Sequence, residues 1–394
     1  MLFRIKNMRY NFDEIVPRTG TNSYKWDSAV DTDVLPMWVA DMDFRTAPVI
    51  IETLRQRVEH GIFGYTRVPD AYYEAVTGWF ERRHGWQIRK EWMICTSGVV
   101  PAISAVIKAL TEPGDKVLVQ TPVYNCFFSS IRNNGCEIIR TPLSYAHDTF
   151  TIDYEDLEKK AADPKVKVML LCNPHNPVGR VFTGKELEEL FAFAARHDIV
   201  VVADEIHSDL ILEGEHIPAI TLNEAARQRV ILHHSASKTY NIPGLPVAFA
   251  IIPNEKLRHK YEEVAATMHA PFDTLSFVAL EAAFTKGEEW RQELLEYLRE
   301  NKKWLDERIS RIPGLSICHS EGTYLGWIDA RETGLSDPAG FFMKEAGVKF
   351  NDGESFSAPG FIRVNFACPR AYLEEAFDKV EKALDNWKKQ EKVY

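Results

Sequence analysis

The sequence lacks the features that would place the chain in a membrane, send it out of the cell or bring it to nucleic acid. No run of about 18 apolar residues occurs, so no membrane span is expected. The segment from Met1 to Met8 has neither a long apolar core nor a small-residue cleavage site, which argues against a signal peptide. Met8 is an alternative start. A net charge of −10 argues against nonspecific binding to nucleic acid.

Cysteine is scarce and irregularly spaced. The six cysteines form no CxxC pair and no spacing typical of a disulfide framework. Without an export signal they are best interpreted as reduced thiols of a cytoplasmic protein. Internal repeats and low-complexity segments are missing as well. A chain of 394 residues, 45% of them hydrophobic, is long enough for two or three domains with a large core.

From about residue 48 the chain alternates between helical patterns and apolar strands. Val166–Cys172 and Ile199–Ala203 are nearly continuous apolar runs, as expected for strands covered on both faces. Between them, the capping box Thr183–Glu186 begins an amphipathic helix. This β-α-β unit predicts two parallel strands with a right-handed crossover. Further strands of the same sheet are expected at Val117–Gln120, Val230–His233 and Ala248–Ile252.

Toward the C-terminus the pattern changes to a long charged helix, two candidate strands at Gly322–Asp329 and Phe361–Phe366, and a last amphipathic helix. The predicted fold class is therefore α/β. A large domain with a mostly parallel sheet flanked by helices is expected beside a smaller α+β domain. The predicted parts are an arm over residues 1–47 that completes the smaller domain, a large domain over 48–285 and the smaller domain over 286–394.

Lys238 lies in the motif Ser235-Ala236-Ser237-Lys238, just after the strand that ends at His233. An amine at a strand end can form a Schiff base with pyridoxal phosphate, and the hydroxyls of Ser235 and Ser237 can hold the phosphate. A solvated lysine in a loop is the alternative for this motif by itself. The cofactor is favoured because other segments supply the remaining parts of the same site.

Asp204 follows a buried strand at its carboxyl end, where open parallel sheets bind ligands. Its carboxylate would keep the pyridine nitrogen of the cofactor protonated, so that the ring accepts electrons. The run Asp204–Asp209 also contains several potential metal ligands. Neighbouring side chains of an extended strand point to opposite faces, however, and HExxH spacing is missing. We therefore expect no metal.

Three further segments carry groups that suit the cofactor. Asn176 lies in a turn after a buried strand, where its amide could donate to the phenolic oxygen. Tyr124 follows another strand, and its ring could stack on the cofactor. Gly98 and Val99 precede an apolar helix over 102–110, whose free N–H groups can bind an anion. A turn residue, a core aromatic and an ordinary helix start are the alternatives for each segment by itself.

Arg363 shares one face of its predicted strand with Asn365. A guanidinium there could hold the α-carboxylate of a substrate through two hydrogen bonds. The alternative is a solvent-facing residue of the sheet. Trp38 and Tyr324 are candidates for the lining of the substrate pocket, or ordinary core residues.

In their order along the chain, the motifs SGVV, TPVY, NPHNPVG, ADEIH and SASK and the late arginine resemble the fold-type I pyridoxal phosphate enzymes, the aspartate aminotransferase superfamily. Three longer stretches resemble more narrowly the MalY/PatB group of cystathionine β-lyase-like C–S lyases. They are GTNSYKWD at 20–27, LPMWVADMDF at 35–44 and FGYT at 63–66. The resemblance covers nearly the whole chain.

The resemblance implies a role for several residues toward pyridoxal phosphate. Lys238 would form the Schiff base, and Asp204 would pair with the ring nitrogen. Asn176 would contact the phenolic oxygen and also face the substrate, while Tyr124 would stack on the ring. Lys238, Asp204 and Tyr124 are the residues that we expect to take part in catalysis.

The resemblance also implies contacts with the phosphate, the substrate and a second subunit. Tyr65 would reach the phosphate of the neighbouring subunit, which implies a homodimer with shared sites. Arg363 would bind the substrate carboxylate, beside the backbone of Val39 and Ala40. The phosphate would be held by backbone N–H groups and hydroxyls, those of Gly98, Val99, Ser235 and Ser237.

Two positions depart from the wider superfamily. Many aminotransferases have a phosphate-binding arginine eight residues after the lysine, where this chain has Pro246. Many have tyrosine three residues after the aspartate, where this chain has His207, which we count among the cofactor-binding residues. Both departures favour the lyase group over the transaminases. The resemblance also implies cis peptide bonds at Thr121–Pro122 and Asn176–Pro177.

The reaction that the resemblance implies is α,β-elimination of an L-cysteine thioether such as cystathionine, which gives thiol, pyruvate and ammonia. Lys238 would remove the α-proton, and a thiolate would leave from Cβ. The alternative enzyme is a class I or II aminotransferase that uses the same lysine, aspartate and arginine. A third interpretation is a regulatory or partner-binding protein that keeps the fold. The expected partner is an amino-acid substrate, with no nucleic acid and no membrane.

Overall fold

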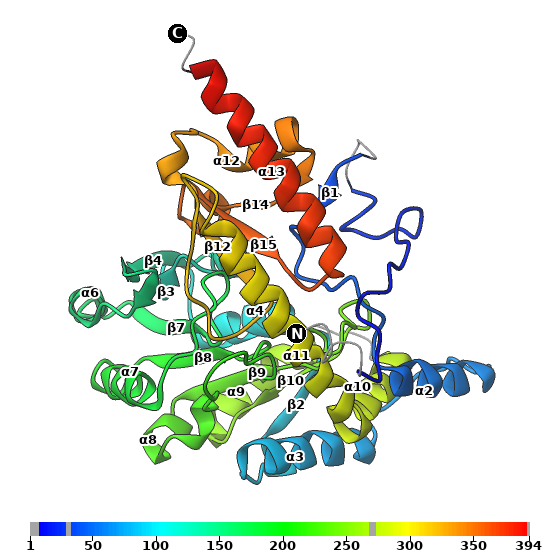
Figure 1. The fold of residues 1–394 in the computed structure, drawn as a ribbon. Helices are drawn as coiled ribbons and strands as arrows, with labels where there is room; N and C mark the ends of the chain where they lie inside the picture. Colours follow the sequence, from blue (N-terminus) through cyan, green and yellow to red (C-terminus); the bar gives the residue numbers. More distant parts are fainter. Residues whose placement is uncertain (1–7, 29–32, 268–272, 392–394) are drawn as a thin grey trace.

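The structure is a computed structural model that describes residues 8–28, 33–267 and 273–391 (Figure 1). Residues 1–7, on which the expectation about a signal peptide rests, lie outside the described part. Among the described helices, none combines the length and the apolar character that crossing a bilayer requires.

A seven-stranded sheet forms the centre of the larger part, in the order β2-β10-β9-β8-β7-β3-β4. Only β10 runs antiparallel to its neighbours; the other strands pair in parallel. All five strands expected in this sheet are present, whereas β2 and β4 were not predicted. The strands are β2 (Met93–Thr96), β3 (Lys116–Thr121), β4 (Glu137–Pro142), β7 (Val166–Cys172), β8 (Val200–Asp204), β9 (Val230–His234) and β10 (Ala248–Ile251).

Alternate side chains of the sheet pack against helices on opposite faces. On β3, Val117 and Val119 lie in one buried cluster, whereas Leu118 between them lies in another. Burial on both faces explains why the predicted strands are continuous apolar runs. Helices α4 (Val99–Leu110), α5 (Cys126–Asn133) and α9 (Glu255–Thr267) cover the first face. The other cluster includes residues of α2 (Pro48–Glu59), α3 (Asp70–His84), α6 (Tyr154–Ala161), α7 (Gly184–Arg196), α8 (Glu224–Arg227) and α10 (Thr274–Lys286).

Local signals set several helix ends. The predicted capping box at the start of α7 is present, with the Thr183 hydroxyl and the Glu186 carboxylate each accepting the other residue's backbone N–H. Helix α4 begins at Val99, earlier than predicted, because Pro101 lies in the first turn, where a helix needs no backbone donor. Gly98 therefore occupies the position before the helix, with its N–H group facing forward.

A four-stranded antiparallel sheet forms the centre of the smaller part, in the order β11-β12-β15-β14. Strand β12 begins at Leu325 rather than at the predicted Gly322, because Thr323 has a φ of 69° and interrupts the extended backbone. The elements are β11 (Ser316–Ile317), β12 (Leu325–Asp329), β14 (Asn351–Asp352), β15 (Phe361–Asn365), α12 (Pro338–Phe341) and the long helices α11 (Glu288–Ile309) and α13 (Arg370–Glu391).

The N-terminal arm joins the smaller part, as the sequence suggested. Strand β1 (Leu35–Pro36) pairs in parallel with β13 (Val348–Lys349), and the Asn365 backbone N–H donates to the Met37 carbonyl at 2.8 Å. Figure 1 shows the arm crossing beside α13 before the chain enters α2. The boundaries expected near residues 47 and 285 remain a prediction.

A buried ion cluster fixes the arm where it turns toward the large sheet. The Lys25 ammonium lies 2.5 Å from Asp43 Oδ2, and both side chains are buried. Trp26 Nε1 donates to the other carboxylate oxygen of Asp43 at 2.8 Å, and Arg18 pairs with both Asp41 and Asp43. Because a charge left alone in the interior is costly, these contacts hold the segment that contains Val39 and Ala40 in one position.

We expect Lys25→Met to lower the free energy of unfolding by about 3 kcal/mol, because it leaves the buried Asp43 carboxylate without its closest cation. Urea denaturation followed by tryptophan fluorescence measures the change. Arg45→Met is the matched control, since the Arg45–Glu14 pair is largely exposed and should contribute less than about 1 kcal/mol. Equal losses in the two variants would contradict the assigned role of the cluster.

Candidate active site

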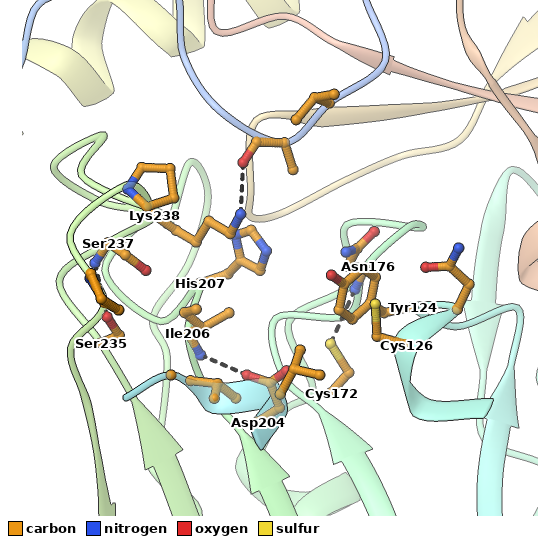
Figure 2. Close-up of a pocket in the computed structure, with 18 of the residues that line it drawn as sticks. Tyr124, Cys126, Cys172, Asn176, Asp204, Ile206, His207, Ser235, Ser237 and Lys238 are labelled. Atoms are coloured by element: carbon orange, nitrogen blue, oxygen red, sulfur yellow. Dashed lines mark hydrogen bonds between the residues drawn. The ribbon is translucent and has the colours of Figure 1, made fainter. Parts of the chain in front are cut away.

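A cavity of about 440 Å³ lies at the carboxyl ends of the large sheet's strands. Residues of the large sheet, the smaller sheet and the N-terminal arm line it together (Figure 2). Every predicted site residue except Tyr65 lines this cavity: Val39, Ala40, Gly98, Val99, Tyr124, Asn176, Asp204, His207, Ser235, Ser237, Lys238 and Arg363.

Asp204 is the last residue of β8 and is 4% exposed. Burial raises the pKa of its carboxyl group to about 6, because a charge is disfavoured away from water. The Ile206 backbone N–H at 3.1 Å and the nearby Lys238 ammonium oppose this rise. The carboxylate therefore gains stabilisation from a further cation, and a protonated pyridine nitrogen is a cation of the required kind.

Lys238 is half-buried in the loop after β9. Its Nζ atom donates to the Ala40 carbonyl at 2.7 Å (Figure 2). Burial lowers the pKa of the amine to about 8, since the ammonium form loses hydration. Only the neutral amine attacks an aldehyde, so this shift makes Lys238 a better nucleophile near neutral pH.

The start of α4 provides the expected anion-binding end of the cavity. Gly98 precedes the helix, so the first N–H groups of α4 have no partner inside the helix. A Cβ added at Gly98 would meet only Pro101 at 3.5 Å, which is an ordinary contact. Nothing in the protein itself thus requires glycine here, and close approach of a ligand to the backbone is the remaining reason.

The serines of the lysine loop lie at the same end. The Ser235 hydroxyl donates to the Val247 carbonyl at 2.6 Å and accepts the Ser237 N–H at 3.1 Å, so it holds the loop in shape. Ser237 lines the cavity with its side chain half-buried. Pro246 lines it as well, at the position where many aminotransferases have arginine.

Arg363 reaches the cavity from β15 of the smaller sheet and is 3% exposed. Its two Nη atoms donate at 2.9 Å to Asn176 Oδ1 and to the Trp38 carbonyl, and its guanidinium lies 4.9 Å from the Phe356 ring centroid. None of the described carboxylates forms an ion pair with it, and its Nε atom is buried without a hydrogen bond. A substrate carboxylate would supply the missing negative charge.

The contact with Arg363 also orients Asn176. Because Oδ1 accepts from the guanidinium, the end of the amide that remains available is its NH₂ group, a donor. This is the group that the predicted contact with the phenolic oxygen needs. Figure 2 shows Asn176 and Tyr124 close together, across the cavity from Lys238.

His207 is a neutral group at the floor of the cavity. Burial lowers its pKa well below the ordinary value, and the positive charges of Lys238 and Arg363 lower it further. Its ring lies edge-to-face with Tyr324 at 6.0 Å, and its Nδ1 atom has no hydrogen-bond partner in the described structure. Tyr324 itself does not line the cavity; its hydroxyl donates to the Ala40 carbonyl at 3.0 Å.

Tyr65 is the one predicted site residue that a single chain does not bring to the cavity. Its side chain is fully exposed. The predicted cis bonds at Thr121–Pro122 and Asn176–Pro177 are present, together with a third, unpredicted one at Asn173–Pro174.

Sequence reasoning missed several lining residues, among them Tyr24, Asn125, Cys126, Cys172, Asn351 and Phe356. Cys126 follows Tyr124 so closely that the same motif could have indicated it. Asn351 pairs with Arg363 in the smaller sheet, and its Nδ2 donates to the Trp38 carbonyl at 2.7 Å. No local pattern announces this pairing. Within the described residues no group of His, Cys, Asp and Glu could hold a metal ion.

The donor set fits pyridoxal phosphate. One end of the cavity offers free N–H groups at a helix start, and the other an unpaired guanidinium. Between them lie a nucleophilic amine, a buried acid, an amide donor and the half-buried ring of Tyr124. Together with a mostly parallel sheet flanked by helices, this arrangement defines a pyridoxal phosphate enzyme of fold type I.

The chain belongs to the family of class I and II aminotransferases, whose sequence model matches residues 32–380. It is 38% identical to cystathionine beta-lyase PatB of Bacillus subtilis, over 95% of this chain and 100% of the relative. It is 34% identical to protein MalY of Escherichia coli, over 93% and 96%. The resemblance predicted from the motifs is thereby confirmed.

Solved structures agree with this assignment. Cystalysin from Treponema denticola, whose structure contains pyridoxal 5'-phosphate, superposes with a TM-score of 0.92 at 34% identity, over 96% of this chain and 100% of that one. A pyridoxal phosphate-bound putative aminotransferase from Clostridium difficile has the same TM-score at 40% identity, over 95% and 100%. The predicted fold class and cofactor are confirmed.

We expect the apoenzyme to capture pyridoxal phosphate faster as the pH rises toward about 8, and to reach a plateau above it, because Lys238 loses its proton there. An ordinary lysine would keep accelerating to about pH 10.4. Stopped-flow absorbance between pH 6 and 10 measures the profile. Lys238→Ala should abolish borohydride-stable attachment, while Lys185→Ala, a change at an exposed lysine of α7, should leave it intact. A rate that still climbs above pH 9 would contradict the buried setting of the amine.

Proposed function

We propose that this chain is a C–S β-lyase that converts L-cysteine thioethers into a thiol, pyruvate and ammonia. The observation that carries the proposal is its 38% identity with a cystathionine β-lyase along nearly the whole of both chains. Such a match includes the segments that line the cavity. The sequence motifs around Lys238 and in the N-terminal arm led independently to the same reaction.

Arg363 orients the substrate. Its guanidinium is held from behind by Asn176 and the Trp38 carbonyl, so little side-chain entropy is lost when it binds the substrate's α-carboxylate. The amino acid is thereby placed with its α-carbon toward Lys238. This orientation decides which bond at the α-carbon faces the lysine.

Lys238 moves the proton. When bound, pyridoxal phosphate supplies an electron sink for the charge that develops at the substrate's α-carbon. Asp204 holds the proton on the pyridine nitrogen that makes the sink effective. The Lys238 amine, neutral near physiological pH, takes the proton from the α-carbon. The Cβ–S bond then breaks, and its electrons leave with the thiolate.

The charges of the lining favour a monocarboxylic thioether over a dicarboxylic amino acid. Among the described residues that line the cavity, Lys238 and Arg363 are the only lysine and arginine. Lys238 is engaged with the cofactor, so Arg363 can bind one carboxylate and no second guanidinium meets another. The remaining lining includes Tyr24 and Trp38, whose rings lie 5.3 Å apart and suit an apolar sulfur substituent.

A class I or II aminotransferase remains the second candidate function. It would use the same lysine, aspartate and arginine, and one solved structure of 40% identity is described as a putative aminotransferase. The difference lies in the fate of the α-proton, which a transaminase returns to the cofactor rather than losing a β-substituent. The intact catalytic set argues against a purely regulatory role.

Incubation with cystathionine and no keto-acid acceptor separates the two reactions. We expect pyruvate and free thiol to accumulate over many turnovers, as measured by lactate dehydrogenase coupling and a thiol reagent. A reaction that stops after one turnover identifies a transaminase and contradicts the proposal. A panel of S-alkyl and S-aryl cysteines, scored in the same way, identifies the preferred thioether.

Arg363→Lys tests the substrate contact in the same assay. It should retain the cofactor but lose about 100-fold in kcat/KM, because an ammonium cannot form the two parallel hydrogen bonds. The matched control is Arg331→Lys, a change at a surface arginine that pairs with Asp329 outside the cavity. Similar losses in both variants would show that Arg363 has no special role.

The active enzyme is proposed to be a homodimer with shared sites. Large apolar side chains are exposed on α2 and in the segment after it, where Tyr65 lies, and a second copy of the chain would cover them. They are Ile51, Val58, Ile62, Phe63 and Tyr65. A monomer in sedimentation equilibrium at micromolar concentration would contradict this assembly. The cytoplasmic location stays a prediction, supported by six free cysteines.

A further inference from the structure

A second buried histidine lies directly behind the lysine loop and has no place in the proposed reaction. His234 is the last residue of β9, immediately before Ser235, and is 1% exposed. Phenylalanine rings enclose its imidazole: Phe284 stacks on it at 5.9 Å, and Phe249 meets it edge-on at 5.4 Å. Only its two nitrogens therefore reach polar atoms.

Both nitrogens of His234 face acceptors. Nδ1 lies 2.9 Å from the Glu205 carbonyl oxygen, and Nε2 lies 3.1 Å from Asp209 Oδ2. A carbonyl oxygen and a carboxylate cannot donate, so the two contacts are satisfied only when both nitrogens carry hydrogen. His234 and Asp209 thus form a buried imidazolium–carboxylate pair.

The surroundings of Asp209 hold its carboxylate in place. Trp79 Nε1 lies 3.2 Å from both oxygens, and Arg83 lies 3.9 Å away. Arg291 donates to the Asp209 backbone carbonyl at 2.9 Å. The other ionisable groups whose charge acts on this pair are His84, Asp204, Glu205 and His207, and burial lowers the pKa of His84 to about 4, so it is neutral.

The pair joins the two loops that carry the catalytic groups. Asp209 ends the segment 204–209, which begins with Asp204 and contains His207. His234 begins the segment 234–238, which contains Ser235 and ends with Lys238. We propose that His234 and Asp209 act as one positioning pair, which fixes the lysine loop against the loop of the cofactor's acid.

Stability alone does not account for such a pair. Burying two charges costs about as much as their attraction returns, so an apolar pair of similar size would stabilise the core equally well. Glu205 and His216 form a comparable buried pair at 2.9 Å, but the segment of His216 contributes nothing to the described cavity lining. His216→Gln is therefore a matched control for the loss of a buried histidine–carboxylate contact.

The test uses the holoenzyme of His234→Gln, Asp209→Asn and their double variant, beside His216→Gln. Pyridoxal phosphate should dissociate about tenfold more readily from both single variants, with kcat lowered more than KM is raised. The double variant should lose no more than the worse single one, because the two residues act as a unit. Dialysis followed by absorbance measures cofactor retention.

A spectroscopic titration separates positioning from general destabilisation. His234→Gln leaves the Asp209 carboxylate without its cation, which favours the protonated form of the Lys238–cofactor linkage. The pH midpoint of its absorption change should rise by about half a unit or more. Asp209→Asn lets His234 become neutral, so the charge of the pair stays zero and the midpoint stays close to that of the native enzyme.

Three results would overturn the proposal. One is native cofactor affinity and an unmoved midpoint in His234→Gln, another is strictly additive losses in the double variant, and the third is an equal loss of cofactor from His216→Gln. If His234→Gln does not fold, native cofactor affinity in Asp209→Asn is sufficient to reject the pair. None of these measurements depends on which reaction the enzyme catalyses.

Discussion

The structure depends on keeping an amine and a carboxyl group out of water at the edge of one sheet. Burial disfavours both charged forms, so it lowers the pKa of Lys238 and raises that of Asp204. A site in this state gains from any ligand that brings an aldehyde for the amine and a positive nitrogen for the acid. The cofactor's two ends are therefore matched by the electrostatic cost that the empty fold already bears.

Three distant parts of the chain exclude water from that edge. The large sheet provides the floor, the smaller sheet contributes Arg363, and the N-terminal arm places Ala40 over Lys238. Asn241, three residues after Lys238, ties its loop to the arm through the backbone of Met42. The ion cluster around Asp43 makes this cover rigid. Substrate binding, cofactor chemistry and the packing of the arm are thus parts of one arrangement.

Much of the fold could be predicted because its signals are local. Strands buried on both faces are apolar runs, and β7 was predicted to the residue. Strand β2 was missed because it is short and half-buried, and β4 because it is an edge strand with several exposed side chains. The direction of β10 could not be predicted, since a strand's own residues do not reveal whether its neighbours run parallel or antiparallel.

The sequence by itself determined which groups the chain can offer: the lysine, the aspartate, the helix start and the strands that bring them to one edge. Their chemistry and the periodicity around them are properties of short segments. Only the tertiary structure decided that Arg363 has no counter-ion, that Asn351 contacts the Trp38 carbonyl, and that His234 faces Asp209. These contacts join residues that are far apart in the chain, and burial, which sets their energies, exists only when the whole chain has packed.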